Sequence, residues 1–236
     1  MSLRNIMCRI DTEGQREPKV YGVLTDYDLS SWKEVLKGDY TRTSQQRTGT
    51  PPYMAGELLE PRCTSHLYRH DLESLFYVML LMCGRHTFSD AKGEQGTRQV
   101  VMREDSLPYE SWFEQQNYET LAAIKSNFIT KKKPIYVSEP FGAFRQWLIE
   151  IRSRFCKGFS LKSYHSEPSE ELAEGIELEE GVELEEELEE DMELAEGAEF
   201  DDETLGGEVG YSTILDPIPR LRGELKGLTI RYNSSG

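Results

Sequence analysis

Apolar residues recur at helical spacing between residues 71 and 84, where they lie three and four positions apart. Further apolar residues fall on the remaining faces of the same stretch, which is typical of a helix that is buried nearly all round. Gly84 directly follows the last residue of this pattern and is predicted to form the C-terminal cap of the helix. The recurring residues are Leu72, Leu75, Phe76, Met79, Leu80 and Cys83.

Two further stretches have the same period. Residues 106–129 predict one or two amphipathic helices bounded by Pro108 and Pro134, and residues 140–155 predict another. Three lysines follow the first of these stretches at 131–133. Such a triplet is compatible with a nucleic-acid contact, but a solvated helix C-terminus, which favours positive charge, is the preferred reading. No nucleic-acid partner is therefore expected.

Short runs of apolar residues near the start of the chain predict two strands. Residues 6–10 and 19–25 flank a polar turn at 11–18, so they can pair as a hairpin whose open end lies near Asn5 and Asp26. The chain then continues through some twenty polar residues that have neither a helical nor an alternating period. A loop longer than about 15 residues is uncommon inside a compact domain and is usually functional or disordered.

Acidic residues are concentrated in one segment. Twenty of the 43 Asp and Glu residues lie between Glu167 and Glu203, a span without Lys or Arg, so the remaining 23 acids face 27 basic residues. Residues 170–200 form a degenerate repeat in which glycines weaken both helix and strand and uncompensated carboxylates repel one another. We expect a disordered acidic insert. The alternative is a docking tail for a basic protein partner.

The cysteines and the hydropathy of the chain indicate which cellular compartment to expect. Cys8, Cys63, Cys83 and Cys156 are widely spaced, which suggests neither a disulfide framework nor a zinc site, and Cys83 reads as a buried small hydrophobe. No apolar stretch reaches the roughly 18 residues that a membrane span needs. The first ten residues have no signal-peptide core. We therefore expect an intracellular protein, in the cytoplasm or nucleus, with no membrane partner.

Three sequence motifs resemble motifs of protein kinases. The letters DYDL at 26–29 follow the second predicted strand, GTPPYMAGE at 49–57 closes the polar loop, and HDLES at 70–74 opens the buried helix. Together they resemble the fungal-type protein kinase family, which favours an Asp-Phe-Asp-Leu motif at the first position. Tyr27 in place of Phe and Gly56 in place of Pro depart from the family pattern. The resemblance runs to about Lys162 and resumes at 200–207, FDDETLGG.

The resemblance implies a metal and nucleotide site. In protein kinases the catalytic loop reads H-R-D-x-x-x-x-N and the metal ions bridge the ATP phosphates. Asn5 stands at the Asn of that loop and Asp26 at the metal-binding Asp, so both are predicted magnesium ligands. Considered alone, Asn5 is more often a turn or cap former, and Asp26 could equally cap the loop behind it.

The stretch from Asp26 to Glu57 would be the activation segment, with Tyr27, Asp28 and Thr48 inside it. The resemblance implies that Thr50 lies against the catalytic Asp and that Glu57 pairs with a buried arginine. The candidates for that arginine are Arg145, Arg152 and Arg154, among which the sequence does not choose. The alternative is that residues 49–53 are only a turn followed by a helix start.

Asp71 completes the predicted site. It lies in the first turn of the buried helix, where a carboxylate favours the positive end of the helix dipole. The resemblance implies that Asp71 holds the backbone of the catalytic loop. An ordinary acid at a helix N-terminus is the alternative.

These features predict a mainly α chain with three parts. Residues 1–165 form a protein-kinase-like C-lobe with a small β-hairpin, 166–199 the acidic insert, and 200–236 the end of the kinase-like domain and a tail. The family reaction transfers a phosphoryl group from ATP to Ser or Thr of proteins. The catalytic Asp would stand one position before Met1 and the N-lobe motifs are absent, so a catalytically incomplete kinase fragment or pseudokinase is expected. The alternative is a non-catalytic interaction module that binds a basic partner.

Overall fold

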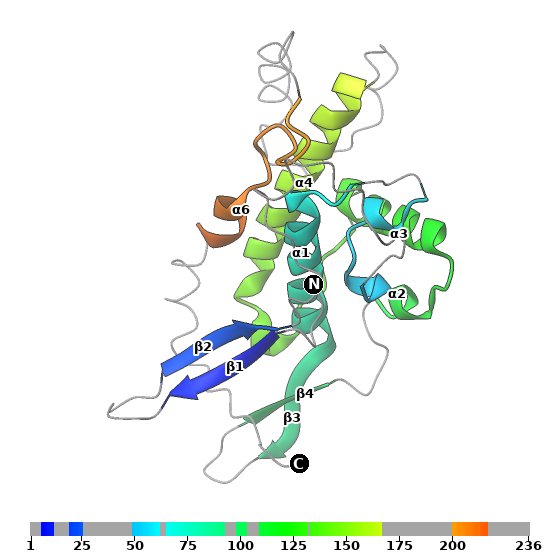
Figure 1. Ribbon diagram of the computed structural model, residues 1–236. Helices are drawn as coiled ribbons and strands as arrows, with labels where there is room; N and C mark the ends of the chain where they lie inside the picture. Colours follow the sequence, from blue (N-terminus) through cyan, green and yellow to red (C-terminus); the bar gives the residue numbers. More distant parts are fainter. Residues whose placement is uncertain are drawn as a thin grey trace.

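Helices dominate the computed structural model, as Figure 1 shows. The structure describes residues 6–11, 19–25, 49–61, 65–92, 98–102, 109–131, 133–166 and 200–216. The prediction of a mainly α chain is confirmed. The predicted acidic insert at 166–199, apart from Ser166, lies outside the described residues, as does the tail after residue 216.

The central helix is α1, Tyr68–Arg85, and its apolar face is almost completely buried. Phe76 and Leu80 have no exposed surface, and Cys83 is 1% exposed, as expected of a small hydrophobe. The predicted cap at Gly84 is wrong, because the helix continues through Gly84 to Arg85. The backbone N–H and the hydroxyl of Ser138 both donate to the carbonyl of Cys83, at 3.0 and 2.9 Å. This external partner satisfies the helix end, so no glycine turn is needed.

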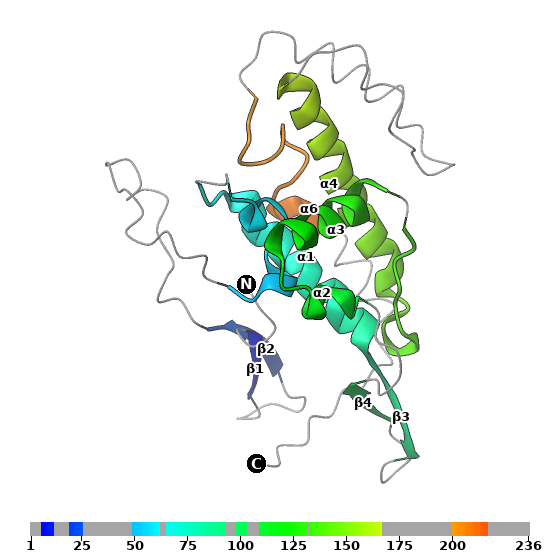
Figure 2. The same cartoon turned by 90° about the vertical axis from the view of Figure 1, so that its right-hand side faces the viewer.

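Three further helices pack around α1. Residues 106–129 contain α2, Ser111–Glu114, and most of α3, Tyr118–Thr130, which confirms the prediction of one or two helices. The last is α4, Phe144–Ser166, which extends well beyond the predicted end at residue 155. In Figures 1 and 2, α4 lies alongside α1, and α2 and α3 cover another side of it.

The core forms where α1, α3 and α4 meet. The ring of Phe76 lies 6.4 Å from that of Phe128 in α3 and 6.0 Å from that of Phe155 in α4. Trp112 of α2 meets Tyr77 edge-on at 5.2 Å. Aromatic pairs at such distances add to the stability that burial of their large apolar surface provides.

Two antiparallel hairpins accompany the helices. The first pairs β1, Ile6–Asp11, with β2, Lys19–Leu24, and confirms the predicted hairpin. The second pairs β3, His86–Lys92, with β4, Arg98–Met102, and the sequence analysis did not predict it. Its register shifts between Phe88 and Lys92, so its apolar residues do not follow the regular alternation from which strands are recognised.

The chain returns to the helices at residues 200–216. This segment passes through a series of turns into α6, Tyr211–Leu215, which contacts α4. Leu205, Val209 and Ile214 are buried against the same core as α1. In the part of the chain that the structure describes, no helix is both long and apolar enough to cross a membrane.

Candidate functional site

The candidate site is the stretch Gly49–Glu57, which we call the closing turn. It contains the 3₁₀ turn η3, Pro51–Tyr53, and leads into η4, Glu57–Leu59. The N–H of Tyr53 donates to the carbonyl of Thr50 at 2.9 Å, and Thr50 itself is exposed. Gly49 has φ +144, a conformation that side chains rarely adopt. The backbone before Thr50 therefore requires this glycine.

Lys125 of α3 holds the closing turn through hydrogen bonds to its backbone carbonyls. Its Nζ donates to the carbonyl of Pro51 at 3.1 Å and to the carbonyl of Met54, and it lies 4.2 Å from the centre of the Tyr77 ring. The side chain has no exposed surface. Burial disfavours the charged form and lowers the pKa of Lys125 to about 7, against the charge of Glu73, which raises it.

Glu73 of α1 holds the other end of the turn. Its Oε1 accepts the backbone N–H of Gly56 at 2.8 Å and the hydroxyl of Tyr77 at 2.7 Å, and the residue is 2% exposed. Burial, together with the charge and hydrogen bond of Glu73, raises the pKa of Tyr77 well above its usual value. The departure from the family pattern at Gly56 now has a physical role, because a proline there would have no N–H to donate.

A proline at position 56 is therefore expected to destabilise the turn. Gly56 has φ −56, which proline can adopt, so Gly56→Pro removes mainly the hydrogen bond to Glu73. We expect a loss of about 1–3 kcal/mol in the free energy of unfolding, measured by urea denaturation. Gly56→Ala is the matched control, since the nearest atom to its added Cβ would lie at 3.6 Å, an ordinary contact. An equal loss in both variants would contradict the role of the N–H.

Glu57 lies at the centre of a network of charges. Its Oε2 accepts Nη2 of Arg69 at 2.5 Å, and its Oε1 accepts Nζ of Lys162 at 2.9 Å. Nε2 of His70 donates to Oε2 at 3.1 Å, since Nδ1 of the same ring accepts the backbone N–H of Leu67. Burial raises the pKa of Glu57, but the hydrogen bonds from His70, Lys162 and Arg69 and the charge of Arg69 outweigh it and hold the pKa well below its usual range.

The buried arginine that pairs with Glu57 is Arg69, and the three predicted candidates are wrong. Arg145 donates to the carbonyls of Ile135 and Val137, and Arg152 donates to the carbonyl of Lys133. Arg154 pairs with Glu208. Arg69 precedes the buried apolar run by only three residues and was not among the candidates.

The structure places few of the other predicted site residues. Asn5, Asp26, Tyr27, Asp28 and Thr48 lie outside the described residues. Asp71 does lie in the first turn of α1, where its Oδ1 is 3.2 Å from Nε2 of His66. Burial raises the pKa of Asp71, but the hydrogen bond and charge of His66 lower it by a larger amount. The net shift of this pKa is therefore downward.

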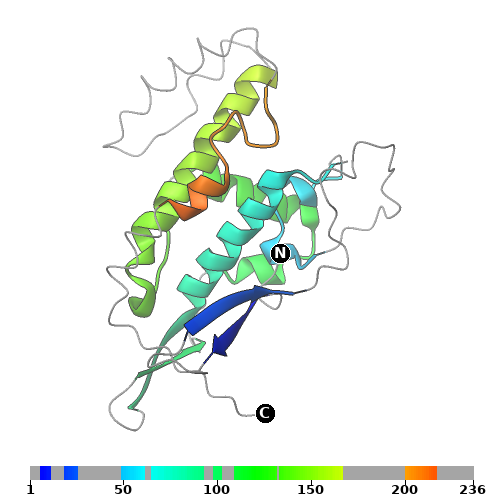
Figure 3. The ribbon, with the colours of Figure 1, turned by 60° about the vertical axis from the view of Figure 1, so that its left-hand side comes forward.

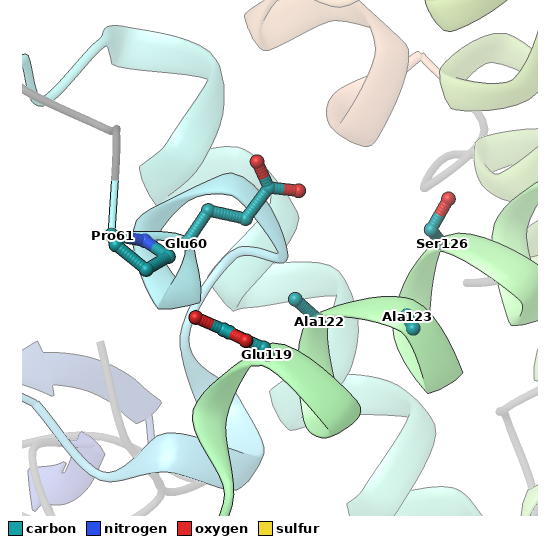
Figure 4. A pocket seen from close by; sticks show the side chains of 6 residues that line it. All are labelled: Glu60, Pro61, Glu119, Ala122, Ala123 and Ser126. Atoms are coloured by element: carbon teal, nitrogen blue, oxygen red, sulfur yellow. The ribbon is translucent and has the colours of Figure 1, made fainter.

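An open hollow of about 460 Å³ lies beside the closing turn. Figure 4 shows Glu60 and Pro61 on one side of it and residues of α3 on the other. Its floor is formed by small side chains, whereas Glu60 and Glu119 supply carboxylates from opposite sides. The lining residues are Glu60, Pro61, Glu119, Ala122, Ala123 and Ser126.

The sequence analysis did not identify the charged residues that form hydrogen bonds to the closing turn. Lys125 lies on the apolar stripe of α3, one residue after Ile124 and three before Phe128, and Glu73 interrupts the apolar run of α1. A charged residue on an apolar face is rarely buried without a partner, so these two positions carried a readable signal. Lys162 carried none, because it lies in a polar stretch near the end of α4.

The metal prediction rests on residues that the structure does not describe. Among the described residues, no group of three His, Cys, Asp or Glu side chains is arranged to hold a metal ion. The predicted ligands Asn5 and Asp26 lie outside this set, and so does the polar loop that follows Asp26 up to residue 48.

One comparison with known proteins found a relative family. A family model described as Fungal protein kinase matches residues 1–83, about a third of the chain. No curated protein and no solved structure matches the chain. The matched part includes the closing turn and ends within α1, so the resemblance beyond residue 83 stays a prediction.

Proposed function

We propose that the chain forms the substrate-holding lobe of a Ser/Thr protein kinase. The match of residues 1–83 supports membership of the fungal protein kinase family. The observation that carries the proposal is the support of the closing turn. Lys125 of α3 and Glu73 and Arg69 of α1 hold it by polar contacts, while Thr50 stays exposed at its start. Such rigid support suits a segment that has to present a protein substrate in one geometry.

The family reaction moves the γ-phosphoryl group of ATP to a hydroxyl, with metal ions neutralising the developing charge. Asn5 and Asp26 are the residues that would hold Mg²⁺, since amide and carboxylate oxygens are the ligands this ion prefers. The 236 residues contain no Gly-rich loop over the phosphates and no catalytic Asp of the H-R-D type. We therefore expect these residues to supply the protein-substrate side of the reaction, with the Gly-rich loop and the catalytic Asp contributed by another segment.

A phosphoryl-transfer assay tests this proposal. The purified 236-residue chain is incubated with radiolabelled ATP, Mg²⁺ and a basic Ser/Thr protein substrate, and we expect no incorporation of label. A second chain, extended at its N-terminus by the N-lobe and catalytic loop of an active fungal-type kinase, is expected to transfer phosphate. Label incorporated by the first chain would overturn the claim that another segment must supply the missing catalytic groups. A folded but inactive extended chain would overturn the assignment to a kinase lobe.

A second candidate function is binding of a basic protein segment without catalysis. The hollow beside the closing turn favours it, because Glu60 and Glu119 place two carboxylates around a floor of small side chains. This function predicts that a Lys/Arg-rich peptide binds the chain in the absence of ATP and that Glu60→Gln with Glu119→Gln weakens binding. Glu139→Gln with Glu150→Gln changes the net charge equally and serves as the control. Equal binding by both double variants would exclude the hollow as the binding site.

A further inference from the structure

The segment Phe200–Asp216 is built into the helical core although the acidic stretch separates it from α4 in the sequence. In Figure 3 it lies along α4 on the side that faces α1. Leu205 and Val209 have no exposed surface, and Ile214 is 4% exposed. Nε1 of Trp147 donates to the carbonyl of Ile214 at 3.1 Å. Burial of three apolar side chains stabilises this position by several kcal/mol, at about 1.5–3 kcal/mol for each.

Asp202 connects this segment to the anchor of the closing turn. Its Oδ1 lies 3.0 Å from Nη2 of Arg69 and 2.8 Å from Nζ of Lys162. The same two cations pair with Glu57, at 2.5 and 2.9 Å. Two carboxylates and two cations therefore alternate in a closed ring, which we call the anchor ring. The carbonyl of Asp202 also accepts Nε of Arg69 at 2.7 Å.

The backbone around Asp202 is shaped to hold this geometry. Leu205 has φ 53, and Gly206 and Gly207 follow at φ 69 and 91, so the chain reverses through three left-handed residues. A left-handed conformation is unfavourable for leucine and persists only where the surroundings enforce it. Here Leu205 packs onto Gly158 of α4, where a Cβ would lie 2.6 Å from that of Leu205. A second contact lies nearby, where Glu203 accepts the first N–H of α1, that of Tyr68, at 2.7 Å.

From these contacts we infer that Asp202 is a positioning residue for the closing turn, and that residues 200–216 act as a brace on α1 and α4 that helps to hold Glu57 in place. Arg69 is fully buried, and its Nε and Nη2 are both used by Asp202. Without Asp202, Arg69 would face Glu57 with two of its three hydrogen bonds lost. The meaning of the brace for substrate binding rests on the proposed function, whereas the brace itself does not.

Hydrogen exchange in the 236-residue chain, without ATP or substrate, tests the brace directly. Asp202→Asn removes the charge from the anchor ring while it keeps the backbone carbonyl and the shape of the side chain. We expect amides in a peptide spanning residues 53–61 to exchange roughly tenfold faster, and those of residues 147–155 to change less than about twofold. Asp216→Asn, at an exposed position at the end of the same segment, is the charge-matched control and is expected to leave both peptides unchanged.

Gly158→Ala perturbs the brace without altering any member of the anchor ring. Its added Cβ would displace Leu205, so the same increase in exchange at 53–61 is expected. Gly142→Ala is the control, because its Cβ would meet only the carbonyl of Glu139 at 3.6 Å.

The double variant Glu57→Gln with Asp202→Asn separates positioning from general stability. If Asp202 acts through the anchor ring, the double variant exchanges no faster at 53–61 than the faster single variant. Additive effects, an increase that is uniform along the chain, or unchanged exchange in Asp202→Asn would each overturn the inference. Because no kinase reaction is measured, failure of the proposed function would leave this result unaffected.

Discussion

Replacing Lys125 with methionine is expected to lower the free energy of unfolding by about 2–4 kcal/mol at pH 7, measured by urea denaturation. Methionine has a similar volume, so little packing is lost. The loss arises because the carbonyl of Met54 loses the Lys125 donor and that of Pro51 keeps only the N–H of Met54. A buried polar group without a partner costs about 1–3 kcal/mol. Lys131→Met is the matched control, since Lys131 is exposed at the end of the same helix. An equal loss in both variants would contradict the supporting role of Lys125.

The pH dependence of this effect has a defined sign. The pKa of Lys125 is about 7 in the folded chain, below its ordinary value near 10.5, so the unfolded chain binds the proton more tightly. Stability of the native chain therefore rises with pH between these values, by up to about 1.4 kcal/mol per pH unit. Methionine does not titrate, so we expect the gap between the two chains to widen by about 1–2 kcal/mol from pH 7 to 8.5. A gap that stays constant would mean that the pKa of Lys125 is not lowered.

Replacing Arg69 with methionine is expected to cost about 3–5 kcal/mol, the range found when one partner of a buried ion pair is removed. The guanidinium is fully buried, and its loss leaves Glu57 and Asp202 facing each other with Lys162 as the shared cation. We expect the lower urea midpoint to be accompanied by faster hydrogen exchange at both the closing turn and residues 200–216.

Arg154→Met is the control for this experiment. Its side chain is 59% exposed and pairs with Glu208 at the surface, so a change below about 1 kcal/mol is expected. A similarly small effect for Arg69→Met would show that the anchor ring contributes little to stability. Exchange that rises at the closing turn alone would show that the two segments are held independently.

The helices were predictable because their signal is local. The spacing of apolar residues in 71–84, 106–129 and 140–155 reports which face of a helix is buried, whatever lies against it. The β1–β2 hairpin was predictable for a similar reason, since a polar turn joins two short apolar runs. The boundaries were less predictable: Ser138, more than fifty residues away, determines how α1 ends, and no local pattern in residues 84–86 contains that information.

The candidate site was predictable in its motif and not in its contacts. The letters GTPPYMAGE mark the closing turn, and Glu57 was expected to pair with a buried arginine. The three candidates for that arginine, Arg145, Arg152 and Arg154, were all wrong. Arg69 is buried where residues 200–216 fold back over the start of α1, and α4 contributes the ring of Phe159 to the same site.

The sequence alone therefore determined the helical class of this chain, its first hairpin, its acidic segment and its resemblance to fungal protein kinases, since each is encoded in neighbouring residues. Only the tertiary structure decided which charges meet. Asp202 reaches Arg69 across 133 positions and Lys162 reaches Glu57 across 105. These ion pairs form where distant segments pack against each other, and such packing leaves no periodic trace in the sequence.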